Sequence, residues 1–394
     1  MGELRAGIYT YAWDLAAEGY DTALGRIAGA GLTAVNLACA YHAGKFLLPH
    51  NPRHRVYFAE DGALYFRPDL ARYGRLRPRV SRFVADEGDP LADLERACRG
   101  RGLEVVAWVV CLHNTWLGER YPDCALWNAF GDPYVHSLTP AHPAVREYLR
   151  ALLTDVVTRA DVAAVELESP GYMGFLHNFH HEIVGVPLDA AQRALLGLSF
   201  NPADLDWASK AGIDGKRLRL HVADALDAAW NGDPAPARRL LDAPELAAYL
   251  ACQQEVVRSL LAELRDAIHL ANAHTAVRLF APPGPDAWES LRYNAVPELA
   301  DGALAGYAVS DEDARNRARN LRAVMGAKPV YGMVRAIAPD TVDSAAQLGP
   351  RVAAWREGGV QGIDFYNYGL MPLPTLDAIG GALGARRETI DDRR

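Results

Sequence analysis

The sequence predicts a closed (β/α)8 barrel, and three observations support this fold class. Short apolar runs alternate with helical segments over almost the whole chain. Eight such pairs in strict alternation are typical of a closed parallel barrel. No G-x-G-x-x-G motif follows the first apolar run, which disfavours the alternative of a doubly wound open sheet. The 394 residues suit one barrel with insertions, since such barrels run from ~200 to over 400 residues.

The expected strands are short apolar runs, and several of them begin just after a glycine that ends the preceding helix, as in AGAG-L, GRG-L and EGG-V. They are placed at 7–13, 32–42, 103–114, 162–169, 274–281, 303–310, 328–335 and 360–368. Proline near a helix start suits the first turn, as at Pro90 and Pro143. The expected helices are 21–30, 89–101, 142–160, 245–272, 287–299, 311–326, 341–357 and 374–383.

Two long connections interrupt this alternation, at residues 43–88 after the second strand and 170–244 after the fourth. Long irregular loops are rare in compact domains unless they serve a function. Both connections follow a strand and precede a helix, which places them on the catalytic face of a barrel. We expect both to pack over the same mouth. Residues 1–385 are expected to form one domain that includes both insertions, and 386–394 a flexible, solvated tail.

Composition limits the classes of partner. The net charge of −8 argues against nucleic acid, which needs a basic face. Five widely spaced cysteines without a C-x-x-C motif support neither a disulfide framework nor a zinc site. The start MGELRAGIYT shows no secretory signal, and no apolar run reaches ~18 residues, so no membrane span is expected. We therefore expect a cytoplasmic protein with a small-molecule substrate; a homo-oligomer remains open.

Glu168 is the sharpest candidate for chemistry. It lies in VAAVELESP, a strand otherwise suited to burial, and an unpartnered buried carboxylate is costly. Glu166 points the same way, because strand residues two apart share a face. The alternative is a structural salt bridge to a barrel arginine such as Arg278, and this alternative is stronger for Glu166, which lies deeper.

A second cluster is DFYNY near the last strand end. Asp364, Tyr366 and Tyr368 alternate onto one face, with Asn367 near the end of the strand. Asp364 is thus the candidate partner for Glu168, with Glu166 in reserve. The alternative is a carboxylate held by tyrosine hydroxyls inside the barrel.

The remaining candidates are aromatic and polar side chains at strand ends, which can stack on sugar rings and bind their hydroxyls. The spacing of His177 and His181 would also suit a metal site on a helix, but it is not an H-E-x-x-H motif, so a substrate loop or surface histidines compete with that interpretation. The expected substrate-binding residues are Tyr11, Trp13, Tyr41, His42, His113, Asn114, Trp116, Tyr172, His181, Arg278, Arg335, Tyr366 and Asn367.

Three segments resemble the superfamily of glycoside-hydrolase-like TIM barrels. They are AGIYTYAWDL with the following GAGLTAVNLACAYHAGKFLLPHNPRHRVYF, then WNAFGDPYVHSLTPAHPAVREYLRALLTDVVTRADVAAVELESPGY, and GGVQGIDFYNYG. In many such hydrolases the fourth strand carries the general acid, and Glu168 matches it. In the commonest clan the nucleophile ends the seventh strand, whereas this chain has MVRAIAP there, with Arg335 and no carboxylate. The resemblance implies cleavage of a glycosidic bond by carboxylate acid/base chemistry.

Two other functions compete on the same barrel. A metal-dependent sugar isomerase or epimerase would suit the segment RIAGAGLTAVNLA, but it needs several His, Asp and Glu ligands at strand ends. The fifth and seventh strands supply Arg278 and Arg335 instead, so we expect neither a metal nor another cofactor. A non-catalytic sugar-binding barrel is the third interpretation, because fold alone does not determine activity.

Overall fold

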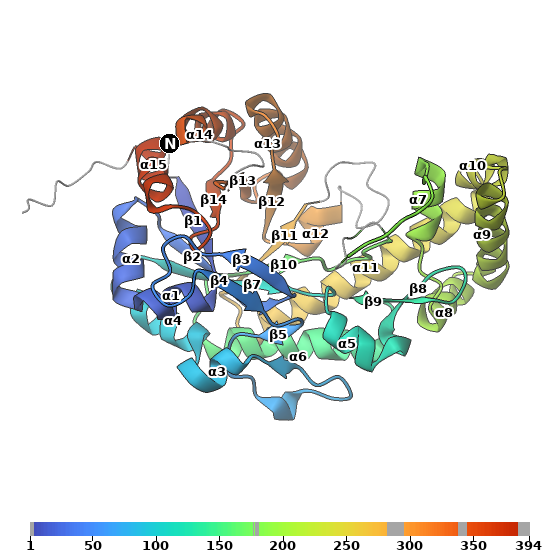
Figure 1. Cartoon of the computed structure of the whole chain (residues 1–394), viewed down its shortest axis with the longest axis horizontal. Helices are drawn as coiled ribbons and strands as arrows, with labels where there is room; N and C mark the ends of the chain where they lie inside the picture. The colour runs from blue at the N-terminus through green and yellow to red at the C-terminus, as the bar shows by residue number, and fades with distance from the viewer. Residues whose placement is uncertain (1–3, 176, 178–180, 282–294, 338–344, 385–394) are drawn as a thin grey trace, which may run out of the picture.

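The computed structural model describes residues 4–175, 177, 181–281, 295–337 and 345–384. Its centre is a closed barrel of eight parallel strands (Figure 1). Strand β1 pairs in parallel with both β2 and β14, which closes the sheet. The (β/α)8 prediction is confirmed. The barrel strands are β1 (Arg5–Thr10), β2 (Ala34–Tyr41), β7 (Glu104–Val110), β10 (Ala164–Glu168), β11 (Ala276–Phe280), β12 (Gly302–Tyr307), β13 (Val330–Arg335) and β14 (Gly362–Tyr366).

The outer helices follow the predicted positions within a few residues, and proline occupies the first position of α4 and α6 as expected. They are α2 (Tyr20–Gly29), α4 (Pro90–Cys98), α6 (Pro143–Arg159), α11 (Pro244–Ala271), α12 (Val296–Leu299), α13 (Asp311–Met325), α14 (Leu348–Glu357) and α15 (Leu373–Leu383). Short η4 (Ala345–Gln347) precedes α14. Most of the helix predicted at 287–299, the start of that at 341–357 and the tail at 386–394 lie outside the described residues.

The first strand ends earlier than predicted. Helix α1 (Ala12–Glu18) begins within the range assigned to the strand. The backbone N–H of Tyr11 donates to the Asp14 carboxylate at 3.3 Å, an N-terminal bond that starts the helix. The aromatic residues at the end of this strand therefore belong to a strand–helix turn.

Residues 43–88 form an irregular arm at the carboxyl end of β2. Strand β5 pairs antiparallel with the last residues of β2, and the ring of Phe46 on β3 lies 5.0 Å from that of Tyr11. This connection therefore packs over the barrel mouth. Its elements are β3 (Gly44–Leu47), β4 (Val56–Ala59), β5 (Ala63–Leu64), η1 (Leu70–Arg72), β6 (Arg79–Val80) and α3 (Arg82–Glu87).

Residues 170–244 follow the expectation in part: His177 contacts His113 just after the end of β7, whereas the helices farther along the connection lie beside the barrel. Their helices build a second apolar cluster, separate from the barrel core, around Leu195, Phe200, Val222 and Leu226. In Figure 1 these helices lie to one side of the barrel. Because these helices bury their apolar side chains in a core of their own, they do not have to pack over the barrel to remove apolar surface from water. The helices are α7 (Ala190–Leu196), α8 (Pro202–Lys210), α9 (Gly215–Trp230) and α10 (Ala235–Leu241).

A third irregular connection, not foreseen from the sequence, follows β7. It contains a β-hairpin that extends from the barrel toward the helices of residues 190–241 (Figure 1). Its elements are α5 (Thr115–Arg120), η2 (Pro122–Cys124), β8 (Ala125–Trp127) and β9 (Pro133–Leu138). Among the described residues, no helix is both long enough and apolar enough to cross a membrane.

Charged side chains fill the lower part of the barrel interior, and we call this set the floor cluster. Glu166 and Asp364 are both fully buried. The Asn36 amide donates to both carboxylates, at 3.2 Å and 3.0 Å. Buried charges require such partners, because desolvation of an unpaired ion is very costly. The floor cluster consists of Arg5, Tyr9, Asn36, Glu166, Arg278 and Asp364.

Gly7 provides the space for this cluster. A methyl group at Gly7 would lie 2.0 Å from the Asp364 carboxylate oxygen and 3.0 Å from Asn36. We expect Gly7→Ala to lower the free energy of unfolding by about 1–3 kcal/mol, the usual cost of overpacking. Gly25→Ala is the control: Gly25 lies in α2 with open space around it, so alanine should be neutral or stabilising. Urea denaturation measures both, and equal stabilities would contradict this assignment.

Candidate active site

Glu168 occupies the carboxyl end of β10, at the mouth of the barrel. It lies two residues beyond Glu166, and its side chain is partly exposed where that of Glu166 is fully buried. The next residue, Ser169, has a φ of 50°, which is uncommon for a residue with a side chain. The indole N–H of Trp108, from the neighbouring strand β7, donates a short hydrogen bond to the Glu168 carboxylate. The carboxyl group is thereby held in one orientation.

The surroundings of Glu168 favour its protonated form. Its pKa is raised to about 7: burial is the largest cause and the negative charge of Glu166 adds to it, while the hydrogen bond from Trp108 lowers the pKa. Burial dominates because the strand around the carboxyl group is apolar. A carboxylic acid that titrates near neutral pH can deliver a proton in a reaction at that pH.

Three tyrosine hydroxyls meet beside this acid. The Tyr11 hydroxyl donates to that of Tyr41 at 2.9 Å and is hydrogen-bonded to that of Tyr366 at 2.8 Å. Burial raises the pKa of all three phenols, so they remain protonated and uncharged. The Arg335 guanidinium lies 5.1 Å from the ring of Tyr307, which comes from β12. Together they form a mouth of aromatic rings and hydrogen-bonding groups.

Imidazoles extend the mouth on the side of β2 and β7. The ring of His42 stacks on Tyr41 at 4.2 Å and on His113 at 4.5 Å. His113 Nδ1 lies 3.2 Å from Nε2 of His177. Burial and the neighbouring imidazoles lower the pKa of His113 to about 2, and burial lowers that of His136 to about 4. These histidines are therefore neutral at neutral pH.

Three candidates from the sequence lie in the floor cluster and not at the mouth. Asp364 accepts from the Arg5 guanidinium at 2.7 Å, and Glu166 pairs with Arg278 at 3.2 Å. The expectation that Asp364 shares the mouth with Glu168 is wrong, because Asp364 lies one layer below Tyr366 on the same strand. Its partners are an arginine and an amide, and not the tyrosines considered from the sequence. Arg278 is likewise occupied by Glu166, so it is not available to a substrate.

Two aromatic candidates are also used for packing. Trp13 is 2% exposed and stacks between Tyr11 at 4.6 Å and Tyr57 at 4.3 Å. The hydroxyl of Tyr172 is buried and donates to Asp204 at 2.6 Å, which joins the barrel to the helices of residues 190–241. Both were expected to stack on a sugar, and neither presents a free face.

Four further candidates have local roles or surface positions. The Asn114 side chain caps α5, and the Asn367 side-chain oxygen accepts from the backbone N–H of Gly369. Trp116 is partly exposed and carries the Arg120 guanidinium over its ring at 4.4 Å. His181 is exposed and has a φ of 58°, so it does not share a helical face with His177.

Trp108, Tyr307 and Tyr9 were missed by the sequence analysis. All three point into the barrel from strands that were assigned correctly. Tyr9 lies two residues before Tyr11, and Trp108 and Tyr307 lie within the runs 103–114 and 303–310. The period-two rule of a strand could have found them if it had been applied to the aromatic residues as well as to the charged ones.

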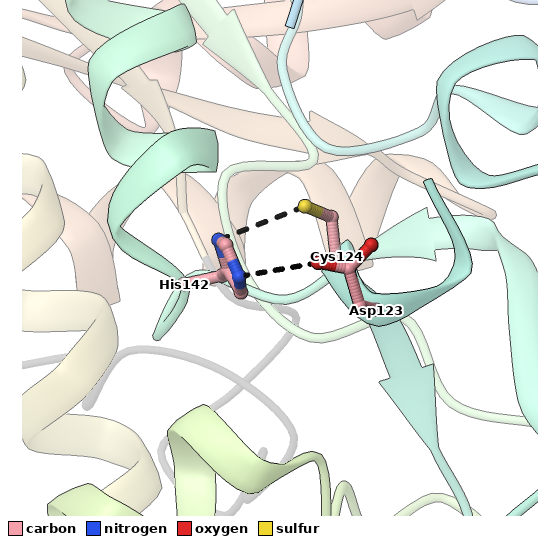
Figure 2. A group of neighbouring side chains, drawn as sticks. All are labelled: Asp123, Cys124 and His142. Carbon is pink, nitrogen blue, oxygen red and sulfur yellow. Dashed lines mark hydrogen bonds and ion pairs between the residues drawn. The ribbon is translucent and has the colours of Figure 1, made fainter. Parts of the chain in front are cut away.

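One group of potential metal ligands is close enough for a single ion within the described part of the chain: Asp123, Cys124 and His142 (Figure 2). However, the Cys124 sulfur faces Nδ1 of His142 at 3.6 Å, whereas the Asp123 carboxylate faces Nε2 at 3.7 Å. These two nitrogens lie on opposite edges of the ring. Arg75 also binds both Asp123 oxygens, so the group fits a cap of α6 better than a metal centre.

Comparisons with known proteins agree with the barrel. No protein-family model and no curated protein matches the chain by sequence. Solved structures do match by fold, and these neighbours are glycoside hydrolases. α-L-Fucosidase isoenzyme 2 from Paenibacillus thiaminolyticus has a TM-score of 0.61 and 10% identity, over 97% of this chain and 49% of its own.

Two further neighbours are similar to the same extent. The β-galactosidase from psychrophilic Marinomonas ef1 has a TM-score of 0.59 and 13% identity, over 96% of this chain and 59% of its own. The PgaB (BpsB) glycoside hydrolase domain from Bordetella bronchiseptica has a TM-score of 0.58 and 12% identity, and the match covers 100% of both chains. The chain thus spans about half to three fifths of the first two neighbours and all of the third. At these identities the likeness establishes the shared fold.

We expect the pKa of Glu168 to be measurable by carbon-13 NMR of the labelled carboxyl groups, with Glu168→Gln identifying its signal. Its midpoint should lie near pH 7, and in Trp108→Phe it should rise further, because the donor that stabilises the charged form is lost. Trp127→Phe is the matched control, since its indole donates to a backbone carbonyl. A midpoint near the ordinary value of 4.5 would show that the carboxyl group is well solvated.

Proposed function

We propose that this protein is a glycoside hydrolase in which Glu168 is the general acid. The observation that carries the proposal is a carboxyl group with a pKa of about 7 at the end of the fourth barrel strand, beside hydrogen-bonding aromatic residues. The fold shared with several glycoside hydrolases supports it. The substrate would be a carbohydrate, and the linkage cleaved a glycosidic C–O bond.

In the proposed reaction, Glu168 supplies the proton and the other residues of the mouth bind the sugar. Glu168 protonates the glycosidic oxygen as the bond to the anomeric carbon breaks. With a pKa of about 7, a substantial fraction of Glu168 is protonated at neutral pH, because burial disfavours the carboxylate. Arg335, Tyr366 and His42 are partly exposed and would bind sugar hydroxyls, and the ring of Tyr307 would pack on the apolar face of the sugar.

A second carboxylate normally completes this chemistry, as nucleophile or as base for water. Glu166 and Asp364 would each have to leave a fully buried ion pair to reach a sugar. Among the described residues, Glu166 is the one carboxylate whose charge acts on the pKa of Glu168. The sequence has acidic residues after β11 and after β13, outside the described residues: Asp286, Glu289, Asp340 and Asp343. Alanine substitution of each, with rescue by azide, would identify the partner.

We expect Glu168→Gln to lower kcat on an unactivated glycoside by about 10²–10⁴-fold, the usual contribution of general acid catalysis. A nitrophenyl glycoside should lose much less, because its leaving group needs no proton. In the wild-type enzyme, kcat/KM should fall above pH ~7, as the acid loses its proton. Exposed Glu119 provides the matched control, Glu119→Gln. Full activity of Glu168→Gln on the unactivated glycoside would refute the assignment.

Chelation separates this function from the isomerase alternative. The guanidinium group of Arg335, at the end of β13, disfavours a cation at the mouth. We therefore expect hydrolysis to continue unchanged after dialysis against EDTA. Activity that is lost on chelation and restored by one divalent ion would favour a metal-dependent isomerase or epimerase. Sugar binding without turnover on any glycoside would favour a non-catalytic barrel.

A further inference from the structure

A continuous row of rings leads from the mouth of the barrel toward the helices of residues 190–241. It starts with Tyr41, His42 and His113, which stack beside Glu168. His177 contacts His113 edge to face at 4.4 Å and stacks on His136 at 5.8 Å. His136 in turn stacks on Tyr134 at 5.9 Å. The row therefore connects β2, β7 and the hairpin β8–β9.

The row ends at two adjoining hollows. The first has a volume of about 560 Å³ and is lined by Tyr134, His136, Phe175 and His177. The second has a volume of about 460 Å³, shares Tyr134 and Phe175 with the first, and reaches Trp230 on α9. Each volume falls in the range of ~300–1,000 Å³ that is typical of small-ligand sites. Because they share a wall, we describe them together as the side groove.

An exposed aromatic pair closes the far end of the side groove. The rings of Phe130 and Trp230 stack at 5.5 Å with an interplanar angle of 26°, and both residues are 40% exposed. They come from segments far apart in sequence, the β8–β9 turn and the end of α9. Large aromatic rings held open to solvent beside polar side chains are characteristic of binding surfaces. Asn128, Asp132 and Asp227 line the groove next to this pair.

We propose that the side groove binds the further residues of an extended, uncharged glycan whose cleaved linkage lies at Glu168. This inference rests on the proposed function and specifies its substrate class: an oligosaccharide or polysaccharide, and not a simple monosaccharide glycoside. The apolar faces of sugar rings would pack on Tyr134, Phe175 and Trp230. Sugar hydroxyls would donate to the carboxylates and to the neutral imidazoles along the row.

The charge of the side groove selects against acidic glycans. Its lining carries Asp132, Glu182 and Asp227 against the single guanidinium of Arg193. The histidines add no compensating positive charge, because burial lowers the pKa of His136 and His177. A polyanionic chain such as a uronic acid polymer would therefore be repelled along the length of the groove.

Calorimetry tests the proposal with neutral gluco-, galacto-, manno- and xylo-oligosaccharides of one to six residues as probes. Binding is measured on Glu168→Gln, so that no probe is cleaved. We expect affinity for at least one series to rise with chain length. In the double variant Phe130→Ala with Trp230→Ala, the affinity for the longest probe should fall roughly 3- to 10-fold, given ~0.5–1.5 kcal/mol for an aromatic contact. Affinity for the monosaccharide should not change.

Phe58→Ala is the matched control, since Phe58 is 69% exposed on the β3–β4 hairpin, away from the groove lining. It should retain the dependence of affinity on chain length. The inference is overturned if no series binds more tightly with length, if the double variant keeps the full gain, or if acidic oligosaccharides bind best. Length-dependent binding with an active Glu168→Gln enzyme would refute the proposed acid and leave the groove in place. Hydrolysis that depends on Glu168 but not on chain length would refute the role of the side groove and leave the proposed acid in place.

Discussion

The fully buried carboxylate of Glu166 is the group on which both the floor cluster and the mouth above it depend. Removed from water, it needs compensation, and it obtains this from Arg278, Tyr9 and Asn36 on three other strands. These contacts align the strands around one polar cluster below the mouth. The negative charge of Glu166 also raises the pKa of Glu168 at the mouth, which favours the protonated form of that residue. The structural glutamate, Glu166, and the proposed catalytic glutamate, Glu168, are thus only two residues apart on the same face of β10.

The mouth above this cluster owes its chemistry to burial. Apolar surroundings raise the pKa of Glu168 and of the tyrosines, and lower that of the histidines, so every one of these groups favours its neutral form. A neutral mouth rich in donors and acceptors suits a substrate with many hydroxyls and no charge. Trp108 connects the two features, because its ring packs on Tyr9 at 5.0 Å while its N–H holds Glu168.

The side groove arises because two irregular connections meet beside the barrel. The hairpin β8–β9 supplies Tyr134 and Phe130, and the segment after β10 supplies Phe175 and Trp230. Both hollows are lined by residues from the two connections. The second apolar cluster includes buried residues of α9, the helix that carries Trp230, so this wall of the groove has an apolar core separate from that of the barrel.

The sequence by itself determined the fold class, because strand and helix periodicities are local and eight repeats leave few topologies. It also determined that Glu168 and Glu166 lie on the same face of their strand, since side chains alternate along any strand. Only the tertiary structure decided which carboxylate is neutralised: Arg5 reaches Asp364 and Arg278 reaches Glu166 across residues more than 100 positions apart. The roles of Trp13, Asn114 and Tyr172, the contact between Trp108 and Glu168, and the groove between two distant loops were likewise decided in space. Which ion pairs form, which side chains are buried and where a groove opens all depend on which distant segments meet. No local pattern of residues encodes those contacts.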